Sequence, residues 1–452
     1  MKLSQALQLQ PAEVVALVGG GGKSSAMFRL GEELVQAGQR VLLTTTTRIA
    51  AEQTAWPPAH VIFDSARQTL TGCLPQLESA LEQHGQVLLT GPIAIDESQG
   101  KALGVHPEVV DRLAALNLCQ AIIVEADGSK KRPFKAPAPY EPVIPGSTSL
   151  AVPVVGLDVL GQPLTEVHVH RPEQVARLAQ VSPGEPVTAD VVARVIAHAD
   201  GGLKGLPATA RVVALLNKLD AVSPDEARTL ARLLLEESRI YAVVAGSVGK
   251  PAGVAWVENR VAAVVLAAGQ ASRFGAPKQL ALWQSKSLLA HVVDAALASR
   301  AARVIVVLGA HADACREALA GRPVEIIFNP DWAAGQSTSV KAGLTALPGH
   351  ISAALFPLAD QPFVTAADID AVISTYQRTL APIVWPEYEG QRGNPVLFDR
   401  RLFPEMMQVT GDTGARPVLQ AHRAEAERVV VANAGVLRDV DTPGDLRLTI
   451  DD

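Results

Sequence analysis

Residues 264–280 read VVLAAGQASRFGAPKQL, and residues 14–30, in the first half of the chain, read VVALVGGGGKSSAMFRL. Each stretch begins with an apolar run, passes through a glycine-rich loop and places a lysine beyond it, Lys278 and Lys23 respectively. A buried strand followed by a glycine loop is typical of nucleotide-binding α/β domains, because glycines let backbone N–H groups approach phosphates closely. The two stretches predict an α/β fold with two such domains in tandem.

Short apolar runs alternate with helix-length amphipathic segments along the whole chain, as expected for strands buried between two layers of helices. The expected strands of the first half are residues 14–18, 41–45, 87–90, 121–125, 150–155, 212–216 and 242–245; those of the second half are 261–267, 304–308, 324–328, 353–357, 383–385 and 428–431. The glycine-rich segment GSVGKPAGVAWVENR separates the two series and predicts a boundary near Glu258. We therefore expect two three-layer α/β/α domains, a P-loop-like domain over residues 1–257 and a Rossmann-like domain over residues 258–452.

The composition limits the classes of partner. The net charge of the 452 residues is -6, which argues against a general affinity for nucleic acid or anionic membranes, so any phosphate binding should be local. Three scattered cysteines, Cys73, Cys119 and Cys315, offer no metal-binding spacing and suit a reducing compartment. The N-terminal MKLSQALQLQP lacks the apolar core of a signal peptide, and we expect a cytoplasmic protein.

The first glycine loop is shorter than the usual phosphate-binding pattern, which would require a glycine where Leu17 stands. It has the form G-x-x-G-K-S, like the loop of amide-forming ligases of the Mur type. We expect Gly19, Gly20, Gly21 and Gly22 to present backbone N–H groups to phosphates, Lys23 to supply charge and the Ser24 hydroxyl to reach a metal ion.

Other motifs of the first half fit the same site. AIIVEADGS ends a strand at Glu125, a candidate metal ligand, and Asp127, which could equally cap the next turn. The basic segment GSKKRPFKAP could receive an anionic substrate or could be a solvated run of charges. The turn Asn217, Lys218 and Asp220 matches the NKxD turn that reads guanine in GTP-binding proteins, or is an ordinary turn in which Asp220 caps the next helix.

Taken together, LVGGGGKSS, LTTTTRI, VEADGSKKRPFKAP and LLNKLD resemble the YqeC-type accessory proteins associated with selenium-dependent molybdenum hydroxylases, over roughly the first 250 residues. The resemblance implies a nucleotide-dependent step in the maturation of a molybdenum or selenium centre. It also implies a bound nucleotide, ATP or GTP, and an apo molybdenum hydroxylase as partner.

In the second loop, Gly269 and Gly275 clear space for phosphates, while Arg273 and Lys278 can stabilise charge as pyrophosphate leaves. The pattern LAAGxxSRFGxxK resembles the nucleotidyltransferases that activate molybdopterin, particularly the MocA-type molybdenum cofactor cytidylyltransferases, and the resemblance extends from Val261 to Asp452. It implies a nucleotide site that includes Leu266, Ala267, Ala268, Gly269, Ser272, Gly275, Gly335, Ser337 and Ser339.

The same resemblance implies a metal and an acceptor side. Asp360, at the end of LFPLADQPFV, would hold Mg²⁺ beside the α-phosphate, and Asp441, in VLRDVDTPGDL, could complete the metal site, although an N-terminal helix cap would also explain Asp439 and Asp441. The pterin-phosphate side would consist of Gly393, Asn394, Pro395, Asp412, Gly414 and Arg416.

The sequence therefore predicts that the second half transfers CMP from CTP to the molybdopterin cofactor and releases pyrophosphate, with no covalent enzyme intermediate. The first half would bind a second nucleotide and assist maturation of the same cofactor or of its target hydroxylase. Two alternatives stay open: a nucleotidyltransferase that uses a sugar phosphate or an alcohol phosphate, and a non-enzymatic chaperone that carries the finished cofactor.

Overall fold

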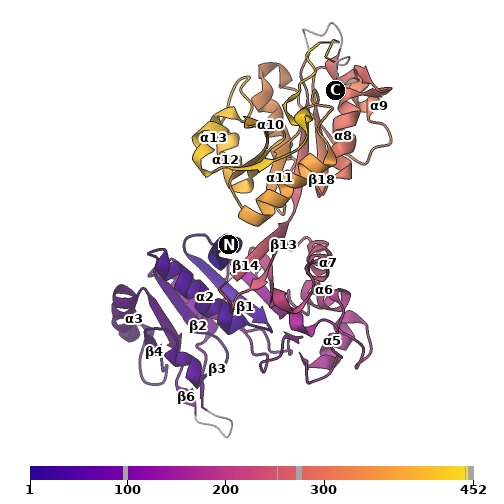
Figure 1. Ribbon diagram of the computed structural model, residues 1–452. Coiled ribbons are helices and arrows are strands. Elements are labelled where there is room, and N and C mark those ends of the chain that lie inside the picture. Colours follow the sequence, from indigo (N-terminus) through magenta and orange to yellow (C-terminus); the bar gives the residue numbers. More distant parts are fainter. Residues whose placement is uncertain (95–99, 252, 271–276, 443, 446–452) are drawn as a thin grey trace. The chain divides into compact units, whose positions relative to one another are not determined.

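The computed structural model describes residues 1–452 apart from 95–99, 252, 271–276, 443 and 446–452. Internal contacts divide the chain into Met1–Glu258 and Asn259–Asp452, here called unit 1 and unit 2. The division falls one residue beyond the predicted boundary. Each unit is an α/β assembly built on its own mostly parallel sheet (Figure 1).

Unit 1 is organised around a nine-stranded sheet with the strand order β14-β13-β12-β10-β1-β8-β2-β5-β4. The strands are β1 Glu13–Gly19, β2 Val41–Thr45, β4 His60–Ile62, β5 Gln86–Thr90, β8 Ala121–Glu125, β10 Leu150–Gly156, β12 Arg211–Asn217, β13 Ile240–Ser247 and β14 Gly253–Asn259. The pairings from β4 through to β13 are all parallel. The central strand β1 is buried over Glu13–Val18, which explains its continuous apolar sequence.

Helices pack against both faces of this sheet. The helices are α1 Leu3–Ala6, α2 Lys23–Gln36, α3 Leu70–His84, α4 Pro107–Ala115, α5 Pro172–Ala179, α6 Ala189–Ala197 and α7 Pro224–Leu235. α3 and α4 share a core with Val14, Ala16 and Val18, and α2 contacts β1, β2 and β8. Helices α5 to α7 form a further core with β10, β12 and β13.

The carboxyl ends of parallel strands lie at one edge of a sheet, so this topology gathers the segments that follow β1, β8 and β12. These segments contain the glycine loop, Asp127 and the Asn217 turn. Two small sheets lie outside the main one: β9 Phe134–Lys135 pairs with β11 Val169–His170, and β3 Ile49–Ala50, β7 Lys101–Ala102 and β6 Ile93–Ala94 form the other.

Unit 2 contains an eight-stranded mixed sheet in the order β19-β18-β15-β20-β23-β21-β22, with β24 paired to β21. The strands are β15 Val261–Ala267, β18 Arg303–Leu308, β19 Glu325–Phe328, β20 Ala353–Phe356, β21 Ile383–Tyr388, β22 Gln391–Arg392, β23 Val396–Asp399 and β24 Glu427–Val430. β23 is antiparallel to both of its neighbours. The carboxyl end of β15 leads into the second glycine loop, and that of β20 leads to Asp360.

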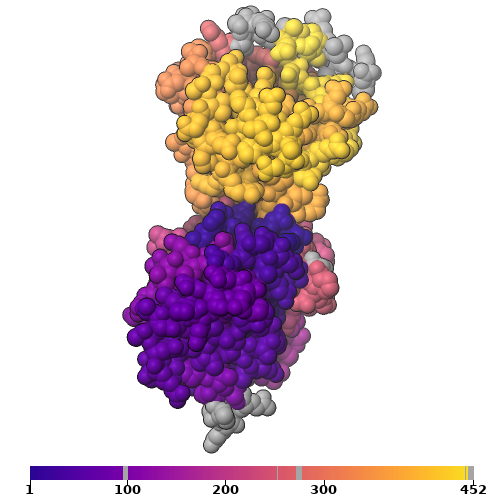
Figure 2. Space-filling view, turned by 90° about the vertical axis from the view of Figure 1, so that its left-hand side faces the viewer, coloured from indigo at the N-terminus to yellow at the C-terminus, as the bar shows by residue number. Residues whose placement is uncertain are grey.

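The helices of unit 2 also cover both faces of their sheet. They are α8 Leu288–Ala298, α9 Ala312–Ala318, α10 Gln336–Thr345, α11 Ala366–Thr379, α12 Phe403–Met406 and α13 Arg416–Ala421. α10, α12 and α13 share one core with Val264, Val307 and Phe356. α8 and α11 contact each other and the sheet. Figure 2 shows that residues from the C-terminal part, coloured yellow, form most of one side of this unit. A short hairpin, β16 Leu282–Trp283 and β17 Lys286–Ser287, precedes α8.

Four strands of the two main sheets, β4, β14, β22 and β23, were not expected from the sequence, and neither were the short strands outside these sheets. β14 lies in the segment that we interpreted as a linker. β23 follows directly on Gly393–Pro395, and its antiparallel direction makes the second sheet mixed. Apolar runs of three or four residues carry too little pattern to separate a short strand from a loop.

Candidate functional sites

The first glycine loop joins β1 to α2 and needs glycine for steric reasons. Gly19, Gly21 and Gly22 have φ values of 93°, 78° and 131°. A Cβ on Gly21 would lie 2.1 Å from the backbone nitrogen of Gly156. The loop is therefore packed tightly against the backbone at the end of β10, in conformations that residues with side chains rarely adopt.

Three amides of this loop donate to acceptors within the protein. Gly20 N–H donates to Val154 O (2.9 Å), Gly21 N–H to Arg132 O (3.0 Å), and Gly19 N–H to both carboxylate oxygens of Asp127 (3.0 and 3.1 Å). We had expected the glycine amides to face phosphates. In this geometry the groups suited to an anion are instead the amides of the first turn of α2, from Lys23 onwards, because a helix leaves its first N–H groups without internal acceptors.

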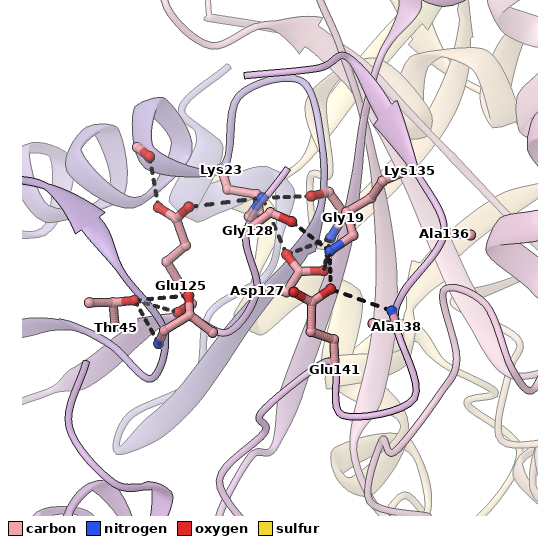
Figure 3. A network of polar contacts seen from close by, with 12 residues as sticks. Gly19, Lys23, Thr45, Glu125, Asp127, Gly128, Lys135, Ala136, Ala138 and Glu141 are labelled. Atoms are coloured by element: carbon pink, nitrogen blue, oxygen red, sulfur yellow. Dashed lines mark hydrogen bonds and ion pairs between the residues drawn. The ribbon is translucent and has the colours of Figure 1, made fainter. Parts of the chain in front are cut away.

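The predicted residues Lys23, Ser24 and Glu125 meet at the carboxyl ends of β1 and β8. Figure 3 shows Lys23 and Glu125 directed toward each other. Lys23 Nζ donates to Gly19 O at 2.6 Å and lies 3.2 Å from Asp127 Oδ1 and 3.8 Å from Glu125 Oε1. The Ser24 hydroxyl donates to Glu125 Oε2 at 2.7 Å. A serine hydroxyl beside a carboxylate is an oxygen donor set suited to Mg²⁺ together with nucleotide phosphates.

A second buried lysine, Lys135, extends this cluster. Its Nζ donates to Gly128 O (2.6 Å) and Glu141 Oε2 (2.7 Å) and lies 3.0 Å from Asp127 Oδ2, and its side chain is 0% exposed (Figure 3). Arg171 Nη1 lies 2.8 Å from the same Glu141 oxygen. In the sequence, Lys135 is only one residue of the basic run GSKKRPFKAP, and no motif marks Glu141 or Arg171. The one local signal was Lys135 standing between buried apolar residues in RPFKAP.

The electrostatics of the cluster follow from burial and pairing. Burial raises the pKa of Glu125, although Lys23 and the Ser24 hydroxyl work in the opposite direction. Burial alone would raise the pKa of Glu141 as well, but hydrogen bonds from Arg171 and Lys135, together with their charges, lower it to about 2. Burial, with the charges of Arg171, Lys135 and Lys130, lowers the pKa of the adjacent His170 to about 4. The buried carboxylates and cations of this site are therefore matched in pairs.

The Asn217 turn lies against the glycine loop. Asn217 Nδ2 donates to Gly21 O at 2.7 Å, and its Oδ1 accepts from Val248 N–H at 3.0 Å. Lys218 pairs with Asp158 at 2.7 Å, and the exposed Asp220 pairs with Lys250 at 2.6 Å. The alternative that Asp220 caps the next helix is wrong, because Ser223 and Glu226 form the capping box of α7.

Unit 2 has a cavity of about 430 Å³ at the carboxyl ends of β15 and β20. It is lined by Leu266, Ala267, Ala268, Gly269, Lys278, Gln279, Trp332, Gln336, Ser339, Leu358, Ala359, Asp360, Asp412 and Arg416. Segments that follow β15 and β20 and segments near α10 and α13 thus line one cavity. The carboxyl ends of the strands are the usual location of a ligand in an open α/β sheet. The predicted residues Ser272, Arg273 and Gly275 lie outside the described residues.

Lys278 joins the two predicted metal ligands of this unit. Its Nζ lies 3.0 Å from Asp360 Oδ2 and 2.7 Å from Asp441 Oδ1. Partial burial works against the charged lysine, but the two carboxylates raise the pKa of Lys278. Two carboxylates that converge on one cation suit Mg²⁺, which proteins bind through one or two carboxylates plus substrate phosphates. Within the described ranges, no three His, Cys, Asp or Glu side chains gather as a metal site.

A pair of hydrogen bonds attaches the segment of Asp441 to the segment of Asp360. Gln361 Nε2 donates to Asp439 Oδ1 at 2.6 Å, and Val440 N–H donates to Asp360 O at 2.9 Å. Burial, together with the nearby Asp360 and Asp441 carboxylates, raises the pKa of Asp439. The structure places the Asp439 side chain against Gln361. The alternative that Asp439 caps a helix stays a prediction, because residues 443 and 446–452, where most of that helix would lie, are outside the described residues.

The remaining predicted residues fall into two groups. Ser339, Asp412 and Arg416 line the cavity, and Gly335 and Ser337 flank it, where a Cβ on Gly335 would lie 2.5 Å from the Gly411 backbone. Gly414 packs against Gln336, which also lines the cavity. Gly393, Asn394 and Pro395 are not among its lining residues; Asn394 N–H donates to Val436 O, and a Cβ on Gly393 would lie 2.7 Å from Val436 Cγ2.

No helix in the described part of the chain is long and apolar enough to cross a membrane. Cys73, Cys119 and Cys315 are unpaired, and burial raises the pKa of each of the three thiols. They are therefore poorly suited to thiolate chemistry.

Comparison with known proteins assigns each unit. Residues 15–173 match the model of the YqeC protein family, and residues 263–427 match that of the MobA-like NTP transferase domain. The uncharacterized protein YqeC of Escherichia coli is 31% identical over 247 residues, which cover 54% of this chain and 90% of that protein.

Two curated proteins match unit 2 with the same identity. The nicotine blue oxidoreductase of Paenarthrobacter nicotinovorans is 28% identical over 191 residues, 40% of this chain and 92% of that protein. The molybdenum cofactor cytidylyltransferase of Escherichia coli is 28% identical over 183 residues, 40% of this chain and 91% of that protein. The chain belongs to the YqeC family through its N-terminal domain, which is fused to a C-terminal MobA-like NTP transferase domain.

Proposed function

We propose that unit 2 transfers the CMP group of CTP to the terminal phosphate of the molybdopterin cofactor and releases pyrophosphate. The observation that carries this proposal is the convergence of Lys278, Asp360 and Asp441 at a cavity that begins at the LAAG end of β15. The MobA-like domain and the similarity to a molybdenum cofactor cytidylyltransferase support the choice of nucleotide and acceptor.

The reaction needs no covalent enzyme intermediate. A terminal phosphate oxygen of the acceptor attacks the α-phosphorus of CTP, the new oxygen–phosphorus bond forms, and the bond to the β-phosphate oxygen breaks with loss of pyrophosphate. Lys278 is placed to stabilise negative charge on the phosphates. Asp360 and Asp441 would hold Mg²⁺, which neutralises phosphate charge when bound. Gln361 and Asp439 keep Asp441 on the Asp360 side of the cavity.

The opposite part of the cavity suits the acceptor. Arg416 is a cation that can bind a phosphate through two parallel N–H groups, and Asp412 can accept hydrogen bonds from a pterin ring. Gly393–Pro395 do not line the cavity, and their proposed role is to support the segment around Val436 without contacting the acceptor.

For unit 1 we propose a P-loop-type nucleotide site that binds ATP or GTP with Mg²⁺ at Glu125 and Ser24. The support is the meeting of the glycine loop, Lys23, Ser24, Glu125 and Asn217 at one edge of the sheet. In this proposal unit 1 assists maturation of the same cofactor, or of an apo molybdenum hydroxylase that is its partner.

The test is an incubation of the full chain with CTP, Mg²⁺ and one acceptor at a time: molybdenum-loaded molybdopterin, a sugar phosphate or an alcohol phosphate. Pyrophosphate release only with molybdopterin, in a 1:1 ratio to a cytidylylated product, supports the proposal. Release with another acceptor assigns a different transferase. Binding of the cofactor without release of pyrophosphate indicates a carrier. If no CTP is consumed with any acceptor, unit 2 is not a transferase of this kind, and a function like that of the similar oxidoreductase becomes the alternative.

A further inference from the structure

The two buried lysines of unit 1 are held in different ways. Lys135 has three oxygen acceptors between 2.6 and 3.0 Å from its ammonium nitrogen. Lys23 has one close acceptor, the Gly19 carbonyl at 2.6 Å, and its distances to Asp127 and Glu125 are 3.2 and 3.8 Å. Lys23 lies against Oδ1 of Asp127 and Lys135 against Oδ2 (Figure 3). Lys135 is thus the fixed partner of Asp127, whereas Lys23 is the more loosely held one.

The charges of this cluster balance. Three carboxylates face three cations: Glu125, Asp127 and Glu141 on one side and Lys23, Lys135 and Arg171 on the other. A neutral buried cluster offers no net attraction to a free metal ion, because a further cation would be in excess. It offers little to a free triphosphate either, because Lys23 could move to a phosphate only by leaving the buried Glu125 without a cation.

These contacts point to an exchange, and the inference rests on the nucleotide site proposed for unit 1. We propose that unit 1 binds a metal–nucleoside triphosphate complex as one unit, in which Lys23 leaves Glu125 for the phosphates while a divalent cation takes its place on Glu125 and Ser24. Lys135 stays on Asp127 as a positioning residue, which keeps Asp127 bonded to the Gly19 amide and preserves the loop.

The geometry makes the exchange local. Lys23 stands in the first turn of α2 directly after the loop, so its ammonium can reach a phosphate bound at that helix end by turning its side chain alone. The Ser24 hydroxyl already donates to Glu125, and the two oxygens are 2.7 Å apart. A divalent cation that binds both groups therefore needs no movement of the backbone.

The first test uses the unaltered full chain at pH 8, with Mn²⁺ in place of Mg²⁺ and the analogues AMP-PNP and GMP-PNP. Mn²⁺ binding is followed by the loss of its free electron paramagnetic resonance signal, and nucleotide binding by calorimetry. We expect metal and nucleotide to strengthen each other's binding by the same factor, between about 5- and 150-fold, since linkage is reciprocal. Binding of the analogue that is unaffected by Mn²⁺ would overturn the inference while leaving a nucleotide site in place. No binding of either analogue under any condition would overturn the proposed nucleotide site as well.

The second test separates Lys23 from the other cations. Lys23→Met should bind Mn²⁺ without nucleotide at least about tenfold more tightly than the unaltered chain, because Glu125 has lost its cation, and adding Glu125→Gln should abolish that gain. Lys131→Met is the matched control, since it removes the same charge from an exposed lysine nearby and should leave Mn²⁺ binding unchanged. If Lys23→Met binds Mn²⁺ no better than Lys131→Met, or if the gain survives Glu125→Gln, Lys23 does not hold the place of the metal. A Lys23→Met chain that fails to fold leaves the first test to decide.

Discussion

Lys278 and Asp441, 163 residues apart in the sequence, lie 2.7 Å apart between Nζ and Oδ1. Asp360 approaches the same ammonium group at 3.0 Å, so one lysine connects the glycine-loop strand, the β20 end and the C-terminal segment. Lys278 therefore marks the point where segments from three parts of unit 2 form one polar site.

The first prediction concerns Asp360. Asp360→Asn should lower pyrophosphate release from CTP by orders of magnitude and leave the fold unchanged, because a charged ligand is lost where phosphate charge gathers. Steady-state pyrophosphate release and circular dichroism measure the two effects. Near-normal turnover in the variant would remove Asp360 from the mechanism.

A second prediction concerns the contact between Gln361 and Asp439. Gln361→Leu should weaken Mn²⁺ binding in the presence of CTP and raise the KM for CTP, because Asp441 loses its support. Asp439→Asn is the control, since an amide oxygen can still accept from Gln361 and should largely preserve KM. Equal losses in both variants would show that the charge of Asp439, and not its hydrogen bond, is what matters.

The third prediction is a dependence of stability on pH. The folded-state pKa of Glu141 is about 2, below its ordinary value of 4.5, so the stabilisation by its ion pairs is present above pH 4.5 and is lost as the pH falls toward 2. The free energy of chemical unfolding of the unaltered chain should exceed that of Glu141→Gln by at most about 3 kcal/mol near pH 6. This difference should shrink steadily below pH 4.5. A difference that stays constant down to pH 2.5 would contradict this account of Glu141.

The fourth prediction concerns the division at Glu258. Fragments 1–258 and 259–452 should each be soluble and folded, because each contains its own sheet and core. Fragment 259–452 should retain pyrophosphate release. Lys23→Ala should abolish nucleotide binding by fragment 1–258 and, in the full chain, should leave pyrophosphate release by unit 2 unchanged. Loss of transferase activity on separation would show that the units depend on each other.

Much of the fold could be predicted from sequence because long buried strands carry their own pattern. The runs that became β1, β8 and β15 are apolar over four to seven residues, and the structure places strands there. β14 escaped prediction because its glycine-rich approach looked like a linker, and β23 because its four residues follow directly on a loop.

The functional sites could also be predicted only where a local sequence pattern is present. Residues in glycine or strand-end motifs, such as Lys23 and Lys278, could be named from the sequence because a local pattern accompanies them. Glu141, Arg171 and Gln361 could not, because their roles come from side chains that meet only after folding: Arg171 reaches Glu141 across 30 residues and Gln361 reaches Asp439 across 78.

Base selection gives a fifth prediction. Ala268 lines the cavity and is buried, and a Cβ on Gly309 would lie 2.8 Å from its methyl carbon. In the proposed CTP site, the Ala268 methyl group would narrow the space for the base and so would favour a one-ring base over a two-ring base. Ala268→Gly should weaken the preference for CTP over GTP without reversing it, since one methyl group changes binding by about 1–3 kcal/mol. Competition assays with both nucleotides measure the ratio of kcat/KM, and an unchanged ratio would exclude Ala268 from base selection.

The proposal that unit 2 is a cytidylyltransferase can be tested through the mass of its product. The full chain is incubated with molybdenum-loaded molybdopterin, Mg²⁺ and an equal mixture of CTP, GTP, ATP and UTP, and the nucleotide adducts are identified by mass spectrometry. We expect a cofactor adduct that carries CMP as the main product, with one pyrophosphate released per adduct and both lost in Asp360→Asn. A main product that carries GMP or AMP, or no adduct while all four nucleotides remain intact, would show that unit 2 is not a cytidylyltransferase.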